Sequence, residues 1–201
     1  MSADRTHKNY LYYNLYLDAL VDYSILENIK ILKIIENQPL SEKLLRYIEE
    51  SRIKYLEFGV DFNFPIDNLP ACVEHIFFHP QSKFNKPLVN LPGNVKTLII
   101  GDGYWQTMEY LPCSLLFLGY HKSRMRFIDK YGELITPLDT LINTNLPNLI
   151  YITIPHDITK YINLTSSIYI KKKIRISSQL DTDFINFIKN DYTIDYFMVH
   201  S

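Results

Sequence analysis

The chain has 201 residues, of which 47% are hydrophobic, and its formal net charge at pH 7 is −1. This length is ample for a packed core, and the balanced charge argues against a nucleic-acid-binding surface, which normally carries a clustered basic excess. Residues 1–8 are polar and charged, and no apolar run approaches the roughly 20 residues that a membrane span requires. We therefore expect a cytoplasmic protein that binds neither nucleic acid nor membrane.

The N-terminal segment, residues 9–51, is predicted to be helical. Apolar residues recur at helical spacing from Tyr10 to Val21 and again from Ile25 to Ile35, before Pro39 stops the pattern. A third helix is predicted from Ser41 to Ser51, with Leu44, Leu45 and Ile48 turned inward. Repeat proteins need capped ends, and this block would serve as the N-terminal cap.

A repeated pattern follows. Each copy has the strand pattern apolar-x-x-apolar-x-apolar, then a turn led by an aromatic residue, then a Leu-Pro step. Strand patterns begin at Ile53, Val73, Val95 and Leu115, and the first three turns are Phe62-Asn63-Phe64-Pro65-Ile66, Phe84-Asn85-Lys86-Pro87-Leu88 and Tyr104-Trp105-Gln106-Thr107-Met108. The steps of 20, 22 and 20 residues between strand starts are typical of a solenoid.

The last two apolar positions of each strand alternate with period two, so they share one side of a strand and face inward, as Leu98 does. Asn63 and Asn85 are placed to satisfy backbone groups of the turns, one repeat above the other. Cys72 and Cys113 lie two repeats apart, which is beyond disulfide reach, and we expect both to be small buried thiols.

These motifs resemble the FNIP repeat, which is named for Phe-Asn-Ile-Pro and is a relative of the leucine-rich repeat. The resemblance covers roughly Ile53 to Pro155; the third copy departs from it, with Trp105 for Asn and Thr107 for Pro. Proteins with this repeat occur chiefly in social amoebae and in large DNA viruses that infect amoebae. The resemblance implies a leucine-rich-repeat-like fold with parallel strands on a concave face.

Two alternatives concern the N-terminal block. Asn37-Gln38-Pro39-Leu40 is similar to the family motif without its Phe, so it could be a decayed first repeat. Many viral members place an F-box, a three-helix module, before the repeats. Residues 1–51 match an F-box in position and length, but the usual opening Leu-Pro is absent.

The register loosens after Leu118. Residues 121–133 are interpreted as an insertion, after which Leu134 to Leu138 resemble the motif in degenerate form. A fifth strand is predicted at Leu149-x-x-Ile152-x-Ile154, and one or two more between Ile168 and Ile176. A short helix over 181–190 and a strand over 192–199 would form the C-terminal cap.

Function in such a scaffold is expected on the outward strand positions, because the inward ones form the core. Outward aromatic and apolar residues predict a binding surface. The candidates for partner binding are Tyr55, His75, Phe77, Thr97, Ile99, Phe117, His121, Tyr151 and Thr153. The alternative is that a flanking segment folds over this face.

No catalytic, metal or cofactor site is predicted. His75 and His79 stand about 13 Å apart along a strand and cannot share one ion. No nucleophile, base and orienting group can be assembled from any motif, and Gly101-Asp102-Gly103 lacks the context of a phosphate-binding loop.

The sequence thus predicts an α/β repeat protein: a helical cap over 1–51, a leucine-rich-repeat-like solenoid with parallel strands over 52–178, and a small C-terminal cap over 179–201. We expect a protein-protein interaction module that is not an enzyme and binds through its concave face. One alternative is an F-box-type substrate receptor that recruits a host cullin ubiquitin ligase through its adaptor. Another is a structural protein that self-associates.

Overall fold

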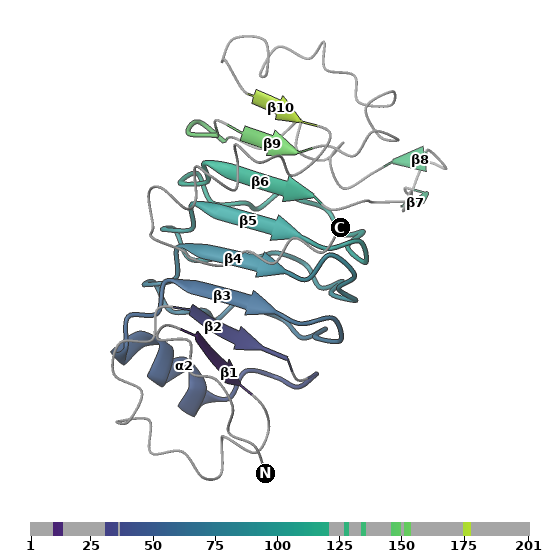
Figure 1. Cartoon of the computed structure of the whole chain (residues 1–201). Helices are drawn as coiled ribbons and strands as arrows, with labels where there is room; N and C mark the ends of the chain where they lie inside the picture. Colours follow the sequence, from purple (N-terminus) through teal and green to yellow (C-terminus); the bar gives the residue numbers. More distant parts are fainter. Residues whose placement is uncertain are drawn as a thin grey trace.

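The computed structural model describes residues 10–13, 31–35, 37–120, 127–128, 134–135, 146–149, 151–153 and 175–177. Within these residues a single parallel sheet dominates, and its strands follow one another in chain order (Figure 1). The strands are β1 (Tyr10–Tyr13), β2 (Ile31–Ile34), β3 (Tyr55–Phe58), β4 (His75–Phe78), β5 (Thr97–Ile100), β6 (Phe117–Tyr120), β9 (Tyr151–Thr153) and β10 (Arg175–Ser177). This order is compatible with the predicted α/β repeat fold.

All the strands of this sheet pair in one register. Leu56 lies opposite Ile76, Ile76 opposite Leu98, and Leu98 opposite Leu118. Equivalent positions of successive motif copies are therefore neighbours in space, as the spacing of the copies predicted. Each copy contributes one short strand and a segment of turns and bends that leads to the next strand.

The core is formed by the apolar positions of the motif, copy after copy. Leu56, Ile76, Leu98 and Leu118 are completely buried, and so is Ile53, the first motif position. Burial of each such side chain stabilises the fold by about 1.5–3 kcal/mol, and a single repeat has no other surface against which to bury them. The inward register predicted for Leu98 is confirmed.

Aromatic rings run through the core at the end of the strands where the turns begin. Phe78 stacks on Phe84 of its own repeat with ring centroids 4.2 Å apart, and on Phe58 of the preceding repeat at 5.0 Å. The series continues from Phe84 to Tyr104 at 6.0 Å. The aromatic residue that leads each turn is thus a core residue, and Tyr104 replaces Phe without a break in the stack.

The turn asparagines form a ladder of hydrogen bonds between repeats. The backbone N–H of Asn85 donates to Oδ1 of Asn63 at 2.9 Å, and the N–H of Trp105 donates to Oδ1 of Asn85 at 3.1 Å. The N–H of Asn63 in turn donates to Oδ1 of Asn37 at 3.1 Å. The role predicted for Asn63 and Asn85 is confirmed. In the third copy the corresponding residue is Trp105, whose side chain has no amide oxygen to continue the ladder.

The helical prediction for residues 10–13 and 31–34 is wrong. Both segments are strands: β1 pairs with β2, and β2 continues the sheet into β3. Ile31 and Leu32 are buried and lie next to the first motif copy, so pairing with β3 outweighs the helical spacing of this short apolar run. Asn37 then joins the asparagine ladder. This favours the alternative interpretation, in which Asn37 to Leu40 are a decayed repeat motif.

The third predicted helix is confirmed as α2 (Glu42–Glu50). It begins at Ser41, whose hydroxyl accepts a hydrogen bond from the backbone N–H of Leu44 at 3.2 Å, a typical N-cap. Leu44, Tyr47 and Ile48 are buried in the common core, while Leu45 is only partly buried. No helix in the described ranges is long and apolar enough to cross a membrane.

The insertion after β6 leaves the sheet unbroken. Phe127–Ile128 (β7) pairs antiparallel with Leu134–Ile135 (β8), while β6 pairs directly with β9. Leu134 and Ile135, which were expected to begin a degenerate copy of the motif, instead pair with β7 in this two-stranded element. The predicted fifth strand is confirmed as β9 and a later one as β10; the proposed helix over 181–190 and strand over 192–199 lie outside the described residues.

Two glycines allow neighbouring turns to approach closely. A Cβ added to Gly101 would lie 2.4 Å from the carbonyl oxygen of His79, and one added to Gly103 would lie 2.3 Å from that of Ser82. The N–H of Gly103 donates to the Ser82 carbonyl at 3.0 Å. Gly101-Asp102-Gly103 is thus a packing turn between repeats.

The two cysteines differ from each other. Both are free, as predicted, but Cys72 is only partly buried and Cys113 is exposed. The expectation of two buried thiols is therefore wrong for Cys113, because the position after the Leu-Pro step is open to solvent there. Cys72 is covered by the neighbouring repeat, and its Sγ lies 3.4 Å from the carbonyl oxygen of Ile48.

Candidate functional site

The outward strand positions form two parallel rows on one side of the sheet, which we call the outward face. The strand register sets both rows. The first row contains Ile31, Tyr55, His75, Thr97, Phe117 and Tyr151, and the second contains Lys33, Glu57, Phe77, Ile99 and Gly119. The predicted stripe of aromatic and apolar side chains is thus divided between two rows, because Phe77 and Ile99 stand two positions further along their strands than Tyr55 and Phe117.

The middle of the outward face is buried in the isolated chain. In the first row the exposed fraction is 1% for His75 and Thr97 and 5% for Tyr55 and Phe117. In the second row it is 8% for Phe77 and 3% for Ile99. The expectation that these six candidates are exposed is therefore wrong, because their side chains are buried.

The other three candidates are less fully described. Tyr151 lies in β9 next to Phe117, and Thr153 stands two residues further along that strand. His121 lies outside the described residues. Seven of the nine candidates, from Tyr55 to Tyr151, therefore stand in the two rows of the register, and the sequence pattern placed them on one face correctly.

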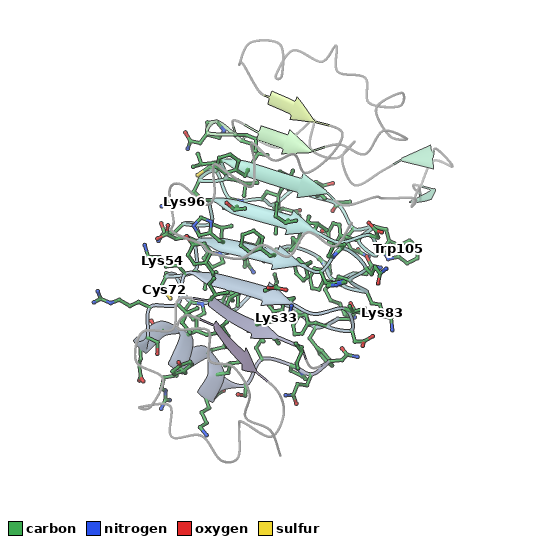
Figure 2. All side chains as sticks on the ribbon, in the orientation of Figure 1. Lys33, Lys54, Cys72, Lys83, Lys96 and Trp105 are labelled. Carbon is green, nitrogen blue, oxygen red and sulfur yellow. The ribbon has the colours of Figure 1, made fainter. Side chains whose placement is uncertain are left out.

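Lys33 and Glu57 mark the accessible end of the second row. They form an ion pair, and their side chains keep 24 and 25% of their exposure (Figure 2 labels Lys33). The row then becomes apolar at Phe77 and Ile99. The second row is consequently charged and partly exposed at β2 and β3, and apolar and buried at β4 and β5.

His75 is the central polar group of the first row. Its ring stacks on Tyr55, with centroids 4.3 Å apart and an angle of 9° between the planes, and its Nδ1 lies 3.0 Å from Oγ1 of Thr97. Burial lowers the pKa of His75 from its ordinary value of 6.5 to about 4. At neutral pH the imidazole is therefore uncharged, and it joins three adjacent strands through one stack and one hydrogen bond.

Beside this row, where the strands begin, three charged residues form a second ladder. Lys54 contacts one carboxylate oxygen of Glu74 at 2.5 Å, and Lys96 contacts the other at 2.5 Å. Partial burial would raise the pKa of Glu74, but the hydrogen bonds and charges of the two lysines outweigh it and lower that pKa below its ordinary value. Figure 2 shows both lysines at this edge of the sheet and Trp105 at the opposite edge.

Sequence reasoning missed two exposed aromatic residues of the third copy. Trp105 is 44% exposed and Tyr110 is 64% exposed. In the two earlier copies the corresponding positions are asparagines, at Asn63 and Asn85 for Trp105. The departure from the motif was the available signal, because a large aromatic side chain has replaced a turn residue that needs no such size.

The described residues contain no group of three or more His, Cys, Asp or Glu side chains arranged to hold a metal ion. His79, the second histidine of the spacing considered above, accepts a hydrogen bond at Nδ1 from the backbone N–H of Gln81 at 3.1 Å. It therefore has a local role in the turn after β4, distinct from that of His75.

Comparison with known proteins agrees with the motif. No family model matches the chain. A FNIP repeat-containing protein of Dictyostelium discoideum is 29% identical over 106 residues, which cover 48% of this chain. The chain matches only 29% of the length of that relative. The in-register copies and the asparagine ladder agree with this similarity to a FNIP repeat-containing protein.

Proposed function

We propose that this chain is a protein-protein interaction module, without enzymatic activity, built on a leucine-rich-repeat-like solenoid. The single register of the sheet and the shared apolar core support the solenoid, because each repeat buries its core only against its neighbours. In this proposal β1, β2 and α2 belong to the N-terminal end of the array, and the elements beyond β9 belong to its C-terminal end.

The observation that carries the interaction role is the exposure of Trp105 and Tyr110. Tryptophan and tyrosine are the residues most enriched among those that dominate binding energy at protein interfaces. Both stand on one segment of the third copy, where the motif itself does not require an aromatic residue. The outward face is the second surface of the proposal, although Phe77 and Phe117 are buried there.

The test compares proteins retained by immobilised wild-type chain and by variants. The double variant Trp105→Ala/Tyr110→Ala should lose a partner while keeping the sheet signal in circular dichroism. Gln81→Ala, an exposed residue of a neighbouring turn, is the matched control and should retain the partner. A partner that all the variants retain equally would refute the proposed surface, and the absence of any retained partner would refute the function.

Self-association is separated from binding of another protein by light scattering. A concentration-dependent increase in mass that Trp105→Ala/Tyr110→Ala abolishes would show that the partner is a second copy of the chain. A stable monomer at all concentrations would leave a different protein as the partner.

Nothing described supports the F-box alternative. An F-box is a three-helix module, whereas Ile31–Ile34 is a strand inside the sheet and Tyr10–Tyr13 pairs with it. Binding of the chain to the adaptor of cullin ligases tests this alternative directly. Saturable binding that is lost on removing residues 1–51, with the remaining repeats still folded, would reinstate it.

A further inference from the structure

Two asparagine positions of the motif become large aromatic residues in the third copy. Trp105 replaces the asparagine of the ladder, and Tyr110 replaces the asparagine that precedes the Leu-Pro step. Within the described part of the chain the indole of Trp105 makes no hydrogen bond or ring contact, so the fold does not use it. The asparagines at these two positions of the first and second copies are Asn63, Asn85, Asn68 and Asn90.

The backbone that carries the two aromatic side chains is held at several points. The N–H of Trp105 donates to Oδ1 of Asn85 at 3.1 Å, and the hydroxyl of Tyr104 donates to the carbonyl oxygen of Thr107 at 3.0 Å. Tyr104 and Met108 are buried in the core between the exposed residues. Thr107 stands where both earlier copies have proline, so the tyrosine hydroxyl adds a constraint where the proline ring is missing. A segment held in this way loses little conformational freedom when it binds.

The surroundings of these side chains are acidic. In the sequence of residues 97–120 the charged residues are Asp102 and Glu109, and there is no lysine or arginine. Glu109 is exposed and adjoins Tyr110 in the chain, and it forms no ion pair with any described residue. In the rows of Glu109 and Tyr110 the two earlier copies contribute an aspartate, a valine and two asparagines, and Lys86 of the second copy lies in neither row.

A positively charged side chain fits this combination of groups. The faces of tryptophan and tyrosine rings attract cations, and a carboxylate beside them supplies the opposite charge. Arginine is, with tryptophan and tyrosine, among the residues that dominate binding at interfaces, and such residues tend to face one another across an interface. Four residues separate Trp105 from Glu109, which is at most about 14 Å of extended chain, so one short basic peptide can reach both.

We propose that Trp105, Glu109 and Tyr110, which we call the third-copy patch, bind a basic segment of a partner protein. Arginine or lysine side chains of that segment lie against the two rings and pair with the carboxylate of Glu109. The proposal rests on the interaction function proposed above and names the chemistry of the partner.

Titration of the full chain with a synthetic peptide of three arginines separated by glycines tests the proposal. Trp105 is the one tryptophan of the chain, so tryptophan fluorescence reports on this patch alone. At low salt the arginine peptide should change the fluorescence saturably. The same peptide with citrulline, an uncharged analogue of arginine of nearly equal size, should bind at least about fivefold more weakly.

Three variants that keep Trp105 locate the binding. Glu109→Gln should weaken the arginine peptide by about two- to fivefold, since it removes one ion pair, and Tyr110→Ala should weaken it by about two- to fivefold, since it removes one ring. Asp67→Asn is the matched control, because it removes a carboxylate from the row of Glu109 two repeats earlier, where no exposed aromatic residue accompanies it. It should bind the peptide as wild type does.

Collisional quenching of the Trp105 fluorescence tests the charge of the patch without a peptide. A carboxylate close to the indole favours quenching by cesium ions and disfavours quenching by iodide. Glu109→Gln should therefore lower the ratio of cesium to iodide quenching by about twofold, the size expected for one screened charge nearby. Quenching by neutral acrylamide should stay the same, and Asp67→Asn should change none of the three.

Four results would each overturn the proposal. They are no saturable binding of the arginine peptide at low salt, equal binding of the arginine and citrulline peptides, wild-type binding in both Glu109→Gln and Tyr110→Ala, and an unchanged quenching ratio in Glu109→Gln. Circular dichroism checks the fold of each variant. If a variant fails to fold, the arginine and citrulline peptides on the wild-type chain still decide.

The outcome separates this proposal from the interaction function. A partner that is lost on Trp105→Ala/Tyr110→Ala but fully retained by Glu109→Gln, together with equal binding of the two peptides, would refute only the basic partner. Selective binding of the arginine peptide without any retained partner would leave the cation preference of the third-copy patch standing and refute the interaction function.

Discussion

The burial of the outward face leads to a sharp prediction for Phe77→Ala. Phe77 keeps 8% of its exposure, and its row neighbour Ile99 keeps 3%. Truncation of a phenylalanine in such surroundings removes its transfer free energy and leaves a cavity, which together cost about 3–5 kcal/mol. For a chain of this length, each kcal/mol shifts the melting temperature by about 2–4 °C, so the expected decrease is roughly 6–20 °C.

Tyr110→Ala is the matched control for this prediction. It removes an aromatic side chain of similar size from a position that is 64% exposed, so the free energy of unfolding should change by no more than about 0.5 kcal/mol. Urea denaturation followed by circular dichroism at neutral pH measures both variants. A Phe77→Ala chain as stable as Tyr110→Ala would refute the reasoning, because it would show that the outward face is open to solvent in solution.

Three further predictions concern the turns and the charge of the chain. Asn85→Ala should lower the free energy of unfolding by about 1–2 kcal/mol in urea denaturation, because the side-chain acceptor of two hydrogen bonds from the next repeat is lost. Gly103→Ala should lower the melting temperature, since its Cβ would lie 2.3 Å from a carbonyl oxygen, whereas Gly93→Ala, with nothing within 4 Å, should leave it unchanged. The free energy of unfolding of the wild-type chain should fall by up to about 3 kcal/mol between pH 6.5 and 4. The reason is that the folded-state pKa of His75 is lowered, so that only the unfolded state takes up the proton in this range. His75→Gln should lack this loss. The lowered pKa of Glu74 adds a separate loss only below its ordinary value of 4.5.

The repeats could be predicted from the sequence because each motif position has one physical role. Leu98 had to face inward, and Asn63 had to serve a turn, since the same residue types recur at the same spacing and meet in register. The strand at Ile31–Ile34 could not be predicted in this way. Over four residues, a helical and a strand pattern look alike, and only the neighbouring strand decides between them.

The exposure of the candidate site could not be predicted from the sequence. The pattern placed Tyr55, Phe77 and Phe117 on the outward face correctly, but exposure depends on what packs above a sheet, and no local pattern encodes that. Trp105 is visible in the sequence as a departure from the motif, but that departure alone does not indicate an exposed side chain. Its exposure became evident from the position of the turn at the edge of the sheet.

The asparagine ladder also gives the array a direction. In every rung the amide oxygen belongs to the earlier repeat and the donated N–H to the later one. During synthesis the acceptor at Asn37 is therefore made before the donor of Asn63, and Asn63 before Asn85, so each finished repeat is a template on which the next can be ordered as it leaves the ribosome. Templating through the ladder ends at Trp105, whose side chain offers no oxygen, and from there the growing chain depends on strand pairing and the apolar core alone.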